Sequence, residues 1–255
     1  MKSTHILTVL AGIIPALQAH WVYPVVSINN GAPSQRWQYV RKLGPGPPPY
    51  ASLEDPARGE PHRDIYSDEI RCGRGSFGSA KTTETLVVNA GDEVTFFTFY
   101  TARENNYTQT MYHPGAAQVY LSKAPDNNLE EYKGDGEWFK IRNFGASADG
   151  KTWDLIEKGS LSVTIPKTTP PGKYLLKVEY IAYHQPNWAK MYEFYLACAH
   201  VEIKGPGGGS PGPMVQFPGA YDMFDRTLWR PHSMGYWGMR PGDNYKNPGP
   251  EVWTG

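Results

Sequence analysis

One histidine stands out because of its position. His20 directly follows a segment with the features of a secretory signal, residues 1–19, which has an early Lys2, a short apolar run and a small residue at Ala19. The apolar run is too short to cross a bilayer. If cleavage follows Ala19, the mature chain begins at His20, whose α-amino group and imidazole can chelate one metal ion together. We therefore predict a secreted protein.

A second histidine, His113, is the candidate for a third nitrogen ligand. It lies in the turn His113-Pro114-Gly115, directly before a strand-like segment at residues 117–122, where a side chain can be held at the end of a sheet. Three nitrogen donors, one of them an amine, favour Cu(II) over zinc and over cations that prefer oxygen ligands. We expect the cofactor to be one copper ion.

A strand-like segment, residues 193–198, carries further candidates. Its side chains alternate between the two faces of the strand, so Glu193 and Tyr195 share one face. We expect that face to be polar and the other face to pack against apolar side chains. A tyrosine hydroxyl can occupy an axial position on copper, and Glu193 or His184 can hydrogen-bond a bound oxygen species. Taken singly, His184 or Tyr195 is more often a structural residue, so their functional interpretation depends on His20. Three histidines have no such context and are assigned to structure or solvent: His62, His200 and His232.

The elements that must position these groups are short strands. Strand-like runs separated by turns rich in Gly, Pro and Asn occur at residues 85–100, 117–122, 161–165, 174–184 and 193–203. Inside the first run, residues 89–92 read Asn-Ala-Gly-Asp, which indicates a turn between two strands. Long helical periodicity is hard to find. We therefore predict an all-β antiparallel sandwich.

Two segments outside the strands bear on domain organisation. Residues 29–68 have no regular period and contain a Gly-Pro run, which indicates a long, ordered surface loop. Residues 205–213 resemble a linker, but the tail at residues 214–255 is too short and irregular to form its own core. We interpret the tail as a segment that wraps the sandwich, and predict one domain over residues 20–255.

Composition limits the partners. The chain has 25 Lys and Arg residues against 25 Asp and Glu residues, so neither nucleic acid nor a lipid surface is an expected partner. The many Tyr and Trp residues are typical of surfaces that stack on sugars. We expect a monomer that binds a neutral partner. Asn106 lies in the only glycosylation sequon of the sequence.

The chain has two cysteines, Cys72 and Cys198. In an exported protein an isolated pair is most simply interpreted as one disulfide. The long loop that it would close is worth roughly 4 to 5 kcal/mol in the chain-entropy model. The alternative, two free thiols that act as ligands or nucleophiles, fits an oxidising compartment less well.

Several motifs together resemble a known family, the fungal lytic polysaccharide monooxygenases of auxiliary activity family nine. Their order and spacing extend through nearly all of residues 20–255. The matching pieces are His20 after the signal, Asp68-Glu69-Ile70-Arg71-Cys72, His113-Pro114-Gly115 with residues 120–125, Trp138-Phe139-Lys140-Ile141, residues 171–176 with His184, residues 194–199, residues 217–221 and residues 248–253. The resemblance implies an immunoglobulin-like or fibronectin type III-like sandwich with long loops and a flat copper-bearing face.

The resemblance also implies a role for each candidate. His20 would supply amine and imidazole, His113 the third nitrogen and Tyr195 the axial hydroxyl, in an arrangement called a histidine brace, with His184 positioning the oxygen species. In the family, reduced copper activates O2 or H2O2 and hydroxylates a sugar C–H bond at C1 or C4 of cellulose or a related β-glucan, whose glycosidic bond then breaks. Electrons come from a small reductant or a partner similar to cellobiose dehydrogenase.

Other positions carry further implications. The cysteines that correspond to Cys72 and Cys198 are bonded in the family. We expect no separate carbohydrate-binding module after this domain. Aromatic side chains of the tail are candidates for stacking on glucan rings, the alternative being that they only pack the tail onto the sandwich. These candidates are Tyr245, Trp237, Tyr236 and Trp229.

One residue departs from the family pattern. Glu193 stands where the family usually has Gln, so a donor is replaced by an acceptor, and an ionised carboxylate there would stabilise Cu(II). The leading hypothesis is a copper-dependent lytic polysaccharide monooxygenase. Glu193 motivates an alternative, a secreted copper-binding protein with a brace but little oxidative cleavage. A carbohydrate-binding or structural wall protein is a further alternative.

Overall fold

The computed structural model describes residues 20–45, 59–99, 109–148, 151–183, 193–225, 227–228 and 245–255. Several predictions lie outside these residues: the signal segment 1–19, the sequon residue Asn106, His184, and the aromatics Trp229, Tyr236 and Trp237. The described part contains short 3-10 helices, η2 (Asp68–Ile70), η3 (Ser76–Thr82) and η4 (Pro125–Asn127). None of the helices in this part is long and apolar enough to span a bilayer.

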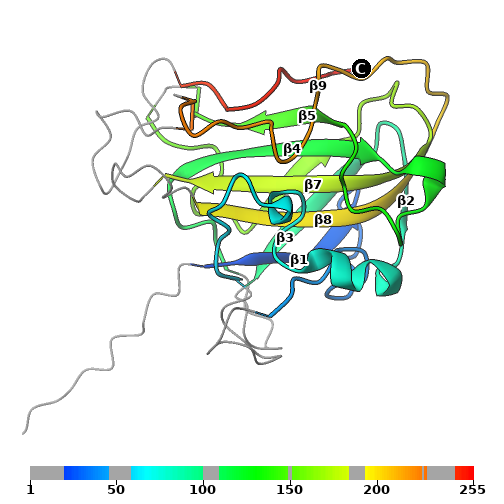
Figure 1. Ribbon diagram of the computed structural model, residues 1–255, viewed down its shortest axis with the longest axis horizontal. Coiled ribbons are helices and arrows are strands. Elements are labelled where there is room, and N and C mark those ends of the chain that lie inside the picture. The colour runs from blue at the N-terminus through cyan, green and yellow to red at the C-terminus, as the bar shows by residue number, and fades with distance from the viewer. Residues whose placement is uncertain are drawn as a thin grey trace, which may run out of the picture.

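Two β-sheets form the body of the protein (Figure 1). The smaller sheet has the order β1 (Val22–Ile28), β3 (Glu93–Phe99), β6 (Ser160–Thr164). The larger sheet has the order β2 (Leu86–Asn89), β8 (Glu193–Lys204), β7 (Gly172–Ala182), β4 (Gly115–Lys123), β5 (Trp138–Phe144), β9 (Met214–Val215). Neighbouring strands are antiparallel except β2, which runs parallel to β8. Apolar side chains from both sheets form one core between them, so the predicted all-β sandwich is confirmed.

The strand predictions were right where turns and alternation mark the sequence. Residues 85–100 form β2 and β3 with the expected turn between them, and the other four predicted runs form β4, β6, β7 and β8. Three strands were not predicted: β1, β5 and β9. The β1 segment is almost wholly buried and contains Pro24, so it lacks the alternation of a half-exposed strand.

The outer face of the larger sheet is also covered. We expected one polar face on β8, and this is wrong, because Tyr195 lies in the core between the sheets while Phe194 and Cys198 are buried in a second apolar cluster. That cluster is completed by residues from the loops and the tail: Ile65, Ile70, Leu129, Tyr132, Phe217, Tyr221 and Leu228. The predicted disulfide is confirmed, since Cys72, which follows η2, is bonded to Cys198 of β8.

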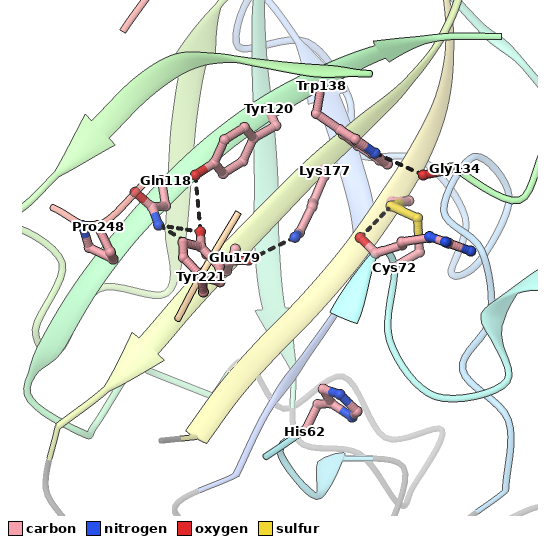
Figure 2. Close-up of polar contacts among 12 residues, drawn as sticks. His62, Cys72, Gln118, Tyr120, Gly134, Trp138, Lys177, Glu179, Tyr221 and Pro248 are labelled. Carbon is pink, nitrogen blue, oxygen red and sulfur yellow. Dashed lines mark hydrogen bonds and ion pairs between the residues drawn. A yellow bond between two sulfur atoms is a disulfide. The ribbon is translucent and has the colours of Figure 1, made fainter. Parts of the chain in front are cut away.

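A buried polar network lies beneath this outer layer (Figure 2). Lys177 Nζ and Glu179 Oε2 form an ion pair of 2.7 Å with both side chains fully buried. Gln118 Nε2 donates to Glu179 Oε1 at 3.0 Å and to the Tyr221 hydroxyl at 2.7 Å, and this hydroxyl lies 3.0 Å from that of Tyr120. Buried charges require such partners. The network therefore fixes Tyr221 of the tail on the sheet, as the wrapping interpretation predicts.

A second buried polar contact holds the long loop to β8. Arg41 Nε donates to His200 Nε2 at 2.8 Å, and Arg41 Nη2 donates to the carbonyls of Leu129 and Tyr132, both at 2.8 Å. Burial, with the nearby Arg41 guanidinium, lowers the pKa of His200 to about 3. His200 is therefore a neutral acceptor with a structural role, as its sequence context indicated.

Acidification should destabilise the metal-free fold through His200. Between its folded pKa of about 3 and an unfolded value of about 6.5, only the unfolded chain binds the proton, so stability falls as the pH falls through this window. This histidine contributes up to about 1.4 kcal/mol per pH unit. We predict that His200→Gln, which keeps an acceptor for Arg41, reduces the slope of unfolding free energy against pH by about that amount. Urea unfolding between pH 7 and 4 measures it, and equal slopes would contradict the prediction.

Candidate metal centre

The ends of several strands meet at one end of the sandwich. Gly115, the first residue of β4, pairs with Ala182, the last residue of β7, and Ala182 pairs with Glu193, the first residue of β8. His113 lies two residues before β4, and His20 lies two residues before β1. Both histidines therefore meet Glu193 at the end of the sandwich where β8 begins, and β8 begins on the left in Figure 1.

The side chains gathered there fit a metal ion. One ligand atom each from His20, His113 and Glu193 lies within 4.8 Å of the others. Two imidazole nitrogens on one ion, each at roughly 2.1 Å, are at most about 4.2 Å apart, so small side-chain movements suffice. The Tyr195 ring lies beside both histidines, with centroids 6.0 Å from His20 and 6.2 Å from His113. The imidazole donors suit copper.

Trp21 holds the residue before it in place. Its ring is buried and stacks on Tyr195, with centroids 3.8 Å apart and planes 9° apart. The edge of Tyr180 meets it at 5.2 Å, and the His113 ring lies 5.9 Å away. Because Trp21 directly follows His20, this packing also fixes the position of His20. We did not single out Trp21 from the sequence, and its only signal is its place between His20 and an apolar run.

The turn at His113 is held from β7. The Tyr180 hydroxyl donates to the His113 carbonyl at 2.5 Å. A side chain at Gly115 would place its Cβ 2.1 Å from the Ile181 carbonyl oxygen, so only glycine allows this close approach of strands. The motif His113-Pro114-Gly115 therefore sets the direction from which the imidazole reaches the centre.

Glu193 and Tyr195 form a buried pair. The Tyr195 hydroxyl donates to Glu193 Oε2 at 3.3 Å, and the Glu193 side chain is 2% exposed. Burial raises the pKa of Tyr195 well above its ordinary value, and the Glu193 carboxylate raises it further. The phenol therefore stays protonated and offers a neutral oxygen beneath the histidines.

Two charged residues of the centre were not predicted from the sequence. Glu60 Oε1 lies 2.9 Å from His20 Nδ1, and Arg63 Nη2 lies 2.5 Å from Glu193 Oε1. Both come from the long loop at residues 29–68, which we predicted as an ordered surface segment without singling out these residues. A metal ion chelated by the amine and Nδ1 of His20 would take the place of the Glu60 contact.

Tyr245, a predicted substrate-binding residue, lies where the tail meets the sandwich. Its hydroxyl is 3.0 Å from that of Tyr183, and its ring packs edge-to-face on Trp153 with centroids 4.8 Å apart. It is half-buried. The most exposed large aromatics among the described residues are Tyr66, at 56%, and Phe224, at 74%. Stacking of Tyr245 on a glucan stays a prediction.

Comparison with known proteins identifies the family. The sequence model of the protein family Auxiliary Activity family 9, formerly GH61, matches residues 20–234 of this chain. The chain belongs to auxiliary activity family 9. An AA9 family lytic polysaccharide monooxygenase of Thermothielavioides terrestris is 39% identical over 251 residues, covering 94% of this chain and 95% of the relative. One of Emericella nidulans is 36% identical over 262 residues, covering 100% of each chain.

Solved structures share the fold. A cellulose-active polysaccharide monooxygenase from M. thermophila matches with a TM-score of 0.67 and 24% identity, covering 92% of this chain and 99% of that one. A glycoside hydrolase family 61 member from Hypocrea jecorina matches with a TM-score of 0.68 and 18% identity, covering 92% and 100%. The immunoglobulin-like sandwich is thereby confirmed. This AA9 protein is a lytic polysaccharide monooxygenase, and the alternative of a copper-binding protein without cleavage activity is not favoured.

The geometry predicts that copper binding requires a free amine on His20. A chain that keeps Ala19 has a peptide nitrogen at this position, which cannot chelate as the amine does. We expect it to bind Cu(II) at least about 100-fold more weakly than a chain that begins at His20, a loss of about 2.7 kcal/mol. Competition with a chelator of known affinity measures the difference. An alanine added after Gly255 is the control, and equal affinities for all three chains would contradict the prediction.

Proposed function

We propose that this AA9 enzyme is secreted, begins at His20, and holds one copper ion between His20 and His113 to cleave cellulose or a related β-glucan. The observation that carries the proposal is the meeting of His20, His113 and Glu193, with ligand atoms within 4.8 Å, over the buried Tyr195. The resemblance to the family supports the substrate class. The family match, which begins at His20, supports removal of residues 1–19.

Each residue has a definite task in this proposal. His20 chelates through its amine and Nδ1, and His113 adds the third nitrogen from its clamped turn. The Tyr195 phenol would offer the ion a neutral oxygen, because its raised pKa keeps the proton on it. Glu193 accepts a hydrogen bond from the Tyr195 hydroxyl and places a carboxylate beside the two histidines. Bound copper supplies one-electron chemistry with O2 or H2O2 that leads to hydroxylation at C1 or C4.

Two parts of the proposal concern partners. Electrons must come from outside the chain, from a small reductant or a protein similar to cellobiose dehydrogenase. By resemblance to the family, His184 would position the oxygen species. Stacking on the glucan would fall to four aromatic residues of the tail, Tyr245, Tyr236, Trp237 and Trp229.

The mature enzyme with copper, ascorbate and cellulose should release oxidised oligosaccharides, detected by mass spectrometry. A chelator should abolish release, and copper but not zinc should restore it. We expect His113→Ala to lower the yield at least about 100-fold, because loss of a metal ligand costs more than the 10- to 100-fold effect of residues around it. His62→Ala is a control of the same type outside the ligand set. Tight copper binding without oxidised products would refute the proposed activity.

A further inference from the structure

The loop at residues 59–65 is joined to the start of β8 by a short β-bridge. The His62 N–H donates to the Phe194 carbonyl at 2.9 Å, and the Phe194 N–H donates to the His62 carbonyl at 2.8 Å. The bridge is antiparallel, so Arg63 lies directly opposite Glu193. Opposite charges in this position attract each other across the pair.

This pairing of residues brings the side chains of Arg63 and Glu193 into contact. Arg63 Nη2 lies 2.5 Å from Glu193 Oε1, while Glu193 Oε2 accepts from the Tyr195 hydroxyl at 3.3 Å. The two oxygens of the Glu193 carboxylate thus contact different partners: one contacts Arg63 of the loop, and the other contacts Tyr195 of the core. A charge-assisted bond to a guanidinium is short and directional, so it restricts rotation of the carboxylate.

The burial of the two partners is unequal. The Glu193 side chain is 2% exposed, whereas that of Arg63 is 45% exposed. A carboxylate removed from water requires a compensating charge, and removal of one partner leaves the other uncompensated. Arg63 supplies that charge while staying in contact with solvent, so its own desolvation is small.

We propose that Arg63 is a positioning residue of the metal centre, which neutralises Glu193 and orients it, so that the Arg63–Glu193 pair sets the balance between Cu(II) and Cu(I). This rests on the proposed binding of copper at His20 and His113. A lone carboxylate beside the ion favours the more highly charged Cu(II). The guanidinium at 2.5 Å offsets this preference.

The test measures the Cu(II)/Cu(I) midpoint potential of the copper-loaded mature enzyme. We expect Arg63→Gln to increase the preference for Cu(II) about tenfold, a potential lower by about 59 mV for one electron. Glu193→Gln alone, which leaves Arg63 unopposed, should shift the potential in the other direction. The double variant restores a neutral pair and should return close to the wild-type potential. The two shifts should cancel because the removed charges have opposite signs and act on the same ion.

Controls separate this effect from general ones. Lys81→Gln removes one positive charge from an exposed ion pair on η3, toward the other end of the sandwich, and should leave the potential unchanged (Figure 1). Arg63→Lys keeps the charge and should shift the potential less than Arg63→Gln. The Cu(II) electron paramagnetic resonance spectrum should change in Arg63→Gln and not in Lys81→Gln.

Equal potentials for Arg63→Gln and the wild type, or a double variant whose potential stays as low as that of Arg63→Gln, would overturn the proposal. In that case a nitrogen-rich Cu(II) spectrum in the wild type would show that copper still binds at the histidines, so the proposed function would stand. A wild type that gives no such spectrum overturns both. Thermal unfolding of each metal-free variant confirms that the chains compared are folded.

Discussion

The packing of Trp21 on Tyr195 is the contact on which the metal centre depends. Terminal residues of a domain are usually poorly ordered unless packing holds them. Here the residue after His20 is buried between Tyr195 and Tyr180 of the larger sheet, while the chain continues into β1 of the smaller sheet. One aromatic side chain therefore joins the two sheets and fixes the proposed N-terminal ligand over them.

The long loop makes the opposite side of the centre. Its position is held within the loop by the bridge from His62 to Phe194, and just after the loop by the disulfide from Cys72 to Cys198. Between and beside these points it covers the outer face of β8 and delivers Glu60 and Arg63 to the histidines. The burial of this face explains why the larger sheet has apolar side chains on both sides, and why its polar residues are paired.

The sequence predicted those parts of the protein that local patterns encode. Turn residues and alternation located most strands, and the place of His20 after a signal, with the turn at His113, indicated the donor set. Arg63 could not be predicted, because its partner is set by the register of a bridge between segments 130 residues apart. The buried second face of β8 was missed for a related reason, since what covers a strand depends on loops that lie far away in the chain.

In the Arg63–Glu193 pair, the negative charge of a strand residue is compensated by the positive charge of a loop residue. A neutral amide at position 193 would offer a donor and an acceptor without a charge to compensate. A carboxylate and a guanidinium reach the same net charge, but the positive half now belongs to the loop, and its distance from the centre depends on how the loop docks. The electrostatics of the histidines are then coupled to the docking of residues 59–65 on β8. Anything that moves residues 59–65 relative to β8 would change the compensation of Glu193, and with it the preference of the centre for Cu(II) over Cu(I).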